Sequence, residues 1–287
     1  MMASEASQRI TEACLASFAD APDARGKEIA QALVRHLHAF TLEIEPTREE
    51  WGKAIEFLTR VGHTCVGARQ EFILLSDVLG VSMLVETMNE GDDEGATEST
   101  VLGPFYVDEP PHAAQGADLT AGLIARGESM LVDVTVEDTS GNPVSGATVD
   151  IWQCAPDGLY DVQRDLPQGE YELRARFTSD SEGKVTCRSI MPIPYQVPSD
   201  GPVGDLLAAT SRHPWRPAHV HFRIVAEGYE TLTTHLFPTG DPYLESDVVF
   251  GVKPSLVIDF DDAGVAGSGE GAESRVLRHR FALQSAS

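Results

Sequence analysis

The clearest candidates for chemistry in the sequence are two histidines separated by one residue, His219-Val220-His221. They lie in an alternating segment, and residues two apart on a strand point to the same side of a sheet. Both imidazoles can therefore reach one point in space and form half of a metal site. An isolated pair of this kind is more often one buried, hydrogen-bonded histidine beside a solvated one, so the spacing suggests a metal without requiring it.

One arginine stands close to this pair in the sequence. Arg216 lies three residues before His219, in the segment RHPWRPA at 212–218, whose two prolines fix the path of the chain into the strand. A guanidinium there would place a permanent positive charge beside a bound metal. The alternative is a surface ion pair, the commoner role of an arginine in an acidic protein.

Two tyrosines occupy constrained positions upstream. Tyr160 lies in the turn PDGLYD at 156–161, and Tyr195 lies in MPIPYQVP at 191–198, where three prolines impose an extended path. Taken alone, each is more often a core aromatic whose hydroxyl is hydrogen-bonded. Because one tyrosine lies in a turn and the other in a rigid proline-rich segment, their hydroxyls are expected to face a cleft.

The N-terminal part of the chain is expected to be helical, because its apolar residues recur at helical spacing from about residue 5 to 90. Helices are expected over 7–18 and 26–40. Further on, Trp51, Ile55 and Leu58 form one apolar stripe, and the segment EFILLSDVLGVSMLVETM is richer in apolar residues still. The acidic stretch NEGDDEGATEST then ends the helical region as a loop.

From about residue 128 the period of the pattern changes to two, as expected for strands. The strand segments are 129–138, 147–152, 171–190, 219–237, 254–260 and 275–283. Short strands joined by turns, with no helices between them, predict an antiparallel sandwich. The expected fold class is α+β, with a helical domain over 1–98 and a mostly antiparallel β-sandwich over 99–287. The glycine-rich segment at 261–274 is expected to be an exposed loop.

The overall charge argues against some classes of function. The chain has 287 residues, 45 acidic and 21 basic, and its net charge of −24 repels nucleic acids and anionic membranes. No segment reads as a signal peptide or reaches the roughly 18 apolar residues of a membrane span. The four cysteines are scattered, which predicts reduced thiols. The expected location is the cytoplasm.

The ordered motifs resemble a known family. DGLYD, PIPYQVPSDGPVG and RHPWRPAHVHF, together with ESTVLGPFY, are similar to the intradiol ring-cleaving dioxygenases, which include catechol and hydroxyquinol 1,2-dioxygenases. The resemblance extends over most of the chain. It implies an enzyme that opens a dihydroxylated aromatic ring with O2, uses one iron(III) per subunit, and forms a muconate-type diacid.

The resemblance also implies which residues hold the iron, namely Tyr160, Tyr195, His219 and His221. Phenolate suits this hard ion, whose charge lowers the pKa of a coordinated tyrosine far below its ordinary value of about 10. In the family the tyrosine at the position of Tyr195 leaves the metal and accepts a substrate proton. Arg216 matches the arginine that stabilises charge on the ring.

His235 departs from the catechol-cleaving members, in which glutamine is expected at this position. A histidine can still donate a hydrogen bond near the iron, and a role as a fifth ligand is the less favoured alternative. The candidate catalytic residues are Arg216, Tyr195 and His235. The remaining histidines match no ligand position.

The positions expected to line the ring site resemble the hydroxyquinol branch of the family. Catechol-type members tend to have an apolar residue where this chain has Asp77. A buried carboxylate needs a partner, and the extra hydroxyl of hydroxyquinol (benzene-1,2,4-triol) would be one. The alternative is that Asp77 caps or ion-pairs within the helical domain. The candidate substrate-binding residues are Leu74, Asp77, Val101, Leu102, Gly103, Pro104, Phe105, Val197, Pro198 and Arg216.

The resemblance further implies a homodimer formed through the N-terminal helices, with an apolar axis that can hold a phospholipid. Three alternatives stay open at this point. The substrate could be catechol or chlorocatechol, the chain could be a metal-free β-sandwich binding module, or the histidines could serve a zinc hydrolase. Zinc is disfavoured, because it prefers histidine, cysteine and carboxylate over phenolate.

Overall fold

The computed structural model describes residues 4–67, 69–91, 93, 95–120, 127–167, 169–262 and 275–286. Its internal contacts divide the chain into two compact units, Met1–Arg60 and Val61–Ser287. The sequence predicts the boundary between the helical domain and the β-sandwich domain after residue 98. This boundary differs from the one after Arg60, and it stays a prediction. Most of the loop expected at 261–274 lies outside the described residues.

The first unit is helical and contains α1 (Glu5–Ala16), α2 (Ala24–Ile44) and most of α3 (Arg48–Thr64). Asp23 caps α2 by accepting hydrogen bonds from two backbone N–H groups of its first turn. The α1 and α2 helices contact each other through a 2.9 Å hydrogen bond between Thr11 Oγ1 and His38 Nδ1. Over their described residues, α1 and α2 bury no side chain.

Two short helices begin the second unit, α4 (Glu71–Val78) and α5 (Val81–Asn89). They come from the single apolar segment that the sequence marked as the richest helical pattern. The break falls at Gly80, whose φ of 74° is left-handed and costs glycine little. The α4 helix buries Leu74 and Asp77 on the same side.

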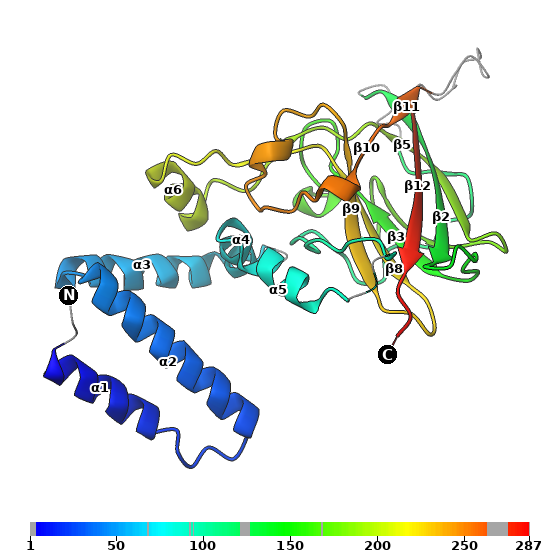
Figure 1. Ribbon diagram of the computed structural model, residues 1–287. Coiled ribbons are helices and arrows are strands. Elements are labelled where there is room, and N and C mark those ends of the chain that lie inside the picture. The colour runs from blue at the N-terminus through cyan, green and yellow to red at the C-terminus, as the bar shows by residue number, and fades with distance from the viewer. Residues whose placement is uncertain are drawn as a thin grey trace. The chain divides into compact units, whose positions relative to one another are not determined.

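The rest of the second unit is a β-sandwich (Figure 1). The first sheet has the strand order β1 (Ala117–Asp118), β5 (Lys184–Ile190), β2 (Ser129–Asp138), β12 (Arg275–Leu283) and β11 (Asp261–Asp262). The second has the order β10 (Val257–Ile258), β9 (Leu232–Pro238), β8 (Val220–Val225), β3 (Thr148–Trp152) and β4 (Arg174–Thr178). Apolar side chains of both sheets form one buried core, so the sheets pack face to face.

The predicted α+β class with a mostly antiparallel sandwich is confirmed, but two details differ from the expectation. The β12 strand pairs with β2 in parallel along nine residues, in the middle of the first sheet. The helix α6 (Pro202–Ala209) interrupts the strands, between β6 (Tyr195–Gln196) and β7 (Trp215–Arg216). It begins at a proline, which fits the first turn of a helix because no N–H is needed there.

Three short 3-10 helices, η2 (Asp161–Gln163), η3 (Leu244–Ser246) and η4 (Pro254–Leu256), complete the second unit as described. Among the described residues, no helix is long and apolar enough to cross a membrane. The four cysteines are free thiols.

Candidate active site

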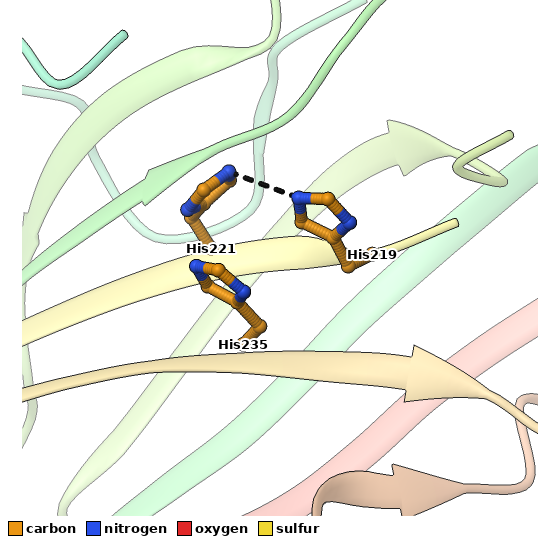
Figure 2. A group of neighbouring side chains, drawn as sticks. All are labelled: His219, His221 and His235. Carbon is orange, nitrogen blue, oxygen red and sulfur yellow. Dashed lines mark hydrogen bonds between the residues drawn. The ribbon is translucent and has the colours of Figure 1, made fainter. Parts of the chain in front are cut away.

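The two tyrosines and two histidines singled out from the sequence meet in one buried cluster, although they come from separate elements. Tyr160 Oη lies 2.9 Å from His221 Nε2 and 3.4 Å from Tyr195 Oη. The two Nε2 atoms of His219 and His221 are 3.2 Å apart, and a dashed line in Figure 2 joins them. All four side chains are at most 5% exposed.

Local structure explains why these four side chains converge. His219 immediately precedes β8 and His221 is its second residue, so the two side chains, one residue apart, point to the same side. Tyr160 caps η2, and its backbone N–H donates to Gln163 Oε1 at 2.9 Å. A side chain at Gly158 would come within 3.2 Å of the Cβ of Tyr195, so glycine permits the close approach of the two tyrosine segments.

The rings are held in a fixed orientation by their neighbours. His219 Nδ1 lies 2.7 Å from the Pro217 carbonyl oxygen, to which it donates, leaving the Nε2 lone pair directed into the cluster. The indole of Trp152 stacks on His221 with centroids 4.5 Å apart, and Phe105 stacks on Tyr160 at 4.6 Å. No sequence pattern marked Trp152 as part of the site, because its place beside His221 depends on the pairing of β3 with β8.

Burial sets the protonation of the side chains in the cluster. It lowers the pKa of His219 and His221 well below the ordinary histidine value, so both rings are neutral and can coordinate a metal. Burial also raises the pKa of Tyr160 and Tyr195, which stay protonated unless a strong cation is present. Ligands about 2 Å from a shared ion lie roughly 3 Å from one another, as these donors do. The donor set therefore fits a highly charged metal such as iron(III).

Arg216 lies directly beside the cluster. It is 3% exposed, and its Nη1 is 3.2 Å from His219 Nε2. Burial alone would disfavour the charged form, but the carboxylate of Asp247, together with Tyr195 and Tyr160, raises the pKa of Arg216 above its ordinary value. A permanent positive charge therefore faces the donors. Asp247 lies in the run GDPYLESDVVFGVKPSL, which resembles the hydroxyquinol branch, but it was not among the predicted site residues.

A cavity of about 590 Å³ adjoins the cluster through Phe105, which both lines the cavity and stacks on Tyr160. Five of the predicted substrate-binding residues line it, namely Leu74, Pro104, Phe105, Val197 and Pro198. The other five, Asp77, Val101, Leu102, Gly103 and Arg216, do not line this cavity. A larger cavity of about 870 Å³ has an acidic lining and contains none of the predicted site residues.

Comparison with known proteins places this geometry in a family. Residues 101–285 match the family model for dioxygenases, and residues 23–97 match the model for the N terminus of catechol dioxygenases. The chain belongs to the intradiol ring-cleavage dioxygenases. The resemblance seen in the motifs is thereby confirmed.

Individual relatives of this dioxygenase are similar along nearly their whole length. It is 51% identical to a 6-chlorohydroxyquinol 1,2-dioxygenase from Cupriavidus pinatubonensis, over 88% of this chain and 90% of the relative. The crystal structure of hydroxyquinol 1,2-dioxygenase from Pseudomonas putida superposes with a TM-score of 0.88 at 43% identity, covering 98% of this chain and 99% of that one. Catechol 1,2-dioxygenase from Pseudomonas arvilla gives 0.83 at 30% identity, covering 99% and 93%.

Asp77 and His235 of the dioxygenase are both buried near Arg216. Burial raises the pKa of Asp77, while a hydrogen bond from Ser82 and the charge of Arg216 act in the opposite direction. His235 lies on β9, opposite His221 in register, and its ring stacks on His219 with centroids 4.7 Å apart (Figure 2). Both residues therefore contribute to the surroundings of the donors.

Proposed function

We propose that this dioxygenase opens hydroxyquinol between its adjacent hydroxyl-bearing carbons with O2. The product would be 3-hydroxy-cis,cis-muconate or its keto tautomer maleylacetate, which contains both oxygen atoms of O2. The observation that carries this proposal is the convergence of two phenol and two imidazole donors beside one buried guanidinium. The relatives named for hydroxyquinol and 6-chlorohydroxyquinol, at 43% and 51% identity, support the choice of ring.

One iron(III) per subunit is assigned to Tyr160, Tyr195, His219 and His221. Two phenolates reduce the charge of the site and favour iron(III) over iron(II). When bound, the iron withdraws electron density from the catecholate and activates it toward O2.

The side chains around the donors have separate tasks in this proposal. Tyr195, ionised when it holds the iron, would accept the proton of a substrate hydroxyl at Oη. Burial opposes this ionisation, and the positive charge of Arg216 favours it. Arg216 stabilises negative charge that develops on the ring, and burial strengthens this interaction because water does not screen it. Phe105, Val197 and Pro198 form the apolar wall of the cavity against which the ring lies and exclude water.

In this proposal the choice between hydroxyquinol and catechol depends on Asp77, which does not line the cavity but lies near Arg216 beside the donors. A buried carboxylate with a raised pKa offers a hydrogen-bond partner for the third hydroxyl of hydroxyquinol, whereas catechol has no group to satisfy it. Catechol and chlorocatechol are the alternative substrates, and the lower identity to the catechol 1,2-dioxygenase makes them second choices.

The dioxygenase is further proposed to work as a cytoplasmic homodimer formed through its N-terminal helices. The support is a stripe on α2 whose members recur at helical spacing and are all more than half exposed: Ile29, Leu33, Leu37, Phe40 and Ile44. A second copy, with a phospholipid between the apolar helices, would cover such a stripe.

Metal content and colour test the iron assignment. The purified protein is expected to contain stoichiometric iron and to be red-brown, from charge transfer between tyrosinate and iron(III), and dithionite should bleach it. A colourless protein, with stoichiometric zinc or without metal, would contradict the assignment. A coloured iron protein without turnover of hydroxyquinol would contradict only the substrate.

A further inference from the structure

The guanidinium of Arg216 is held on two of its sides by other side chains. The carboxylate of Asp247 accepts hydrogen bonds from Nε and Nη2 at 3.1 Å each, in a bidentate ion pair whose side chains are 4% and 2% exposed. His235 Nδ1 lies 3.5 Å from the same Nη2. An arginine can only donate, so His235 accepts through Nδ1 and carries its proton on Nε2.

Asp247 is itself fixed by the loop that follows it. The backbone N–H groups of Val249 and Gly251 donate to its two carboxylate oxygens, at 3.3 and 3.0 Å. A side chain at Gly251 would come within 2.9 Å of Arg216 Nη2 and 3.2 Å of Asp247 Oδ2, so the loop can close on the ion pair only with glycine here. The carboxylate is thus positioned independently of the arginine.

His235 is fixed in a different way. It stands opposite His221 in the pairing of β8 with β9, and its ring packs against His221 at a centroid distance of 4.0 Å. The ring cannot turn without displacing its neighbours, because it is completely buried. Its Nδ1 therefore presents a fixed acceptor to the guanidinium.

These contacts leave one side of the guanidinium for the reaction. Nε and Nη2 are bound to Asp247 and His235, while Nη1 points to the donor cluster, 3.2 Å from His219 Nε2. A guanidinium is planar, so fixing two nitrogens also fixes the third. Electrostatic stabilisation of a transition state depends on such fixed orientation, since a charge that reorients during the reaction loses part of its effect.

We propose that Asp247 and His235 are positioning residues, which clamp Arg216 so that only Nη1 faces the reacting ring. The inference rests on the proposed function, because it needs Arg216 to act on the substrate. It assigns no direct substrate contact to Asp247.

The test compares Asp247→Asn with a matched control in the iron-loaded enzyme. Asp150 forms an ion pair of the same geometry with Arg176, through Nε and Nη2 at 2.6 and 2.8 Å, and is 1% exposed. Asp247→Asn should lower kcat by about 100-fold, while iron content, visible spectrum and the Kd for hydroxyquinol measured without O2 stay within about threefold. Asp150→Asn should lower the melting temperature to a similar extent and leave kcat within about twofold.

Substitutions of His235 provide a second, independent arm. The amide oxygen of His235→Gln can still accept a bond from Arg216 Nη2, whereas His235→Leu cannot. We expect Leu to lower kcat about tenfold, without loss of iron, and Gln to restore most of it.

Three results would overturn the clamp while leaving the proposed function intact. They are wild-type kcat in Asp247→Asn, loss of iron in that variant, or equal kcat in the Gln and Leu variants. Failure of the proposed function is distinguishable, because the wild-type protein would then lack iron or fail to turn over hydroxyquinol.

Discussion

The donor cluster of the sandwich buries polar side chains, whereas the helical unit exposes apolar ones. In the cluster, Tyr160, His219 and His221 are at most 2% exposed, although each carries a polar group. In the helical unit, Leu33 is 58% and Trp51 63% exposed, although both are apolar. The cluster brings its hydroxyl and Nε2 groups into contact with one another within one chain, whereas the helices leave apolar surface uncovered. Chemistry in this protein is therefore expected to be intrinsic to one subunit, and the helices to serve assembly.

The largest expected effect comes from removing one donor. In Tyr160→Phe the ring can still stack on Phe105, but the phenolate is gone, so we expect loss of iron and colour and a fall in kcat of more than about 1000-fold. Iron analysis and the visible spectrum measure this. Tyr106→Phe is the control, since it removes a hydroxyl bound to Asp150 and should retain iron, colour and rate. Normal iron content in Tyr160→Phe would show that Tyr160 is no ligand.

A smaller effect is expected from Arg216→Ala, because the donors themselves remain. Iron and colour should persist while kcat falls by about 100- to 1000-fold, as for the loss of a fixed electrostatic group. Arg176→Ala removes another arginine paired with a buried carboxylate and should leave kcat nearly unchanged. Unaltered turnover in Arg216→Ala would remove the electrostatic role.

A change of preference, with little change in iron binding, is expected from Asp77→Ala. The ratio of kcat/KM for hydroxyquinol to that for catechol should fall by about tenfold or more, because the partner of the third hydroxyl is lost. The ratio is its own control, since errors in iron content cancel in it. An equal ratio before and after would show that Asp77 does not select the ring.

The smallest effect on turnover, and the largest on assembly, is expected from charges on α2. The double substitution Leu33→Glu and Leu37→Glu should convert a dimer into monomers in analytical ultracentrifugation, with kcat per iron within about twofold. Arg35→Glu changes the net charge by the same amount on the opposite side of the helix and should leave the dimer intact. If the monomers lost turnover, the donor cluster of one subunit would not be sufficient for catalysis.

The sequence predicted those parts of the site that depend on local geometry. Strand alternation places His219 and His221 on one face. The turn before Tyr160 and the prolines around Tyr195 indicated that the tyrosine hydroxyls face a cleft. The ligand set itself, however, came from ordered motifs of the family. Local patterns also predicted the N-terminal helices and most strands.

Other features depend on which distant segments pair, and no local pattern contains this information. Asp247 pairs with Arg216 although 31 positions separate them in the sequence. His235 lies opposite His221 only because of the register in which β8 pairs with β9. The parallel pairing of β12 with β2 joins segments more than 130 residues apart, so it too was not foreseen. The short helix α6 was missed because a proline- and glycine-rich start resembles a turn.

The most direct test of the account is O2 consumption by the iron-loaded wild-type protein with hydroxyquinol and with catechol, measured side by side. We predict stoichiometric O2 uptake, a ring-opened product from hydroxyquinol that carries both oxygen atoms of labelled O2, and a higher kcat/KM for hydroxyquinol than for catechol. No O2 uptake with either ring would contradict the proposed reaction, and faster turnover of catechol would contradict the proposed substrate.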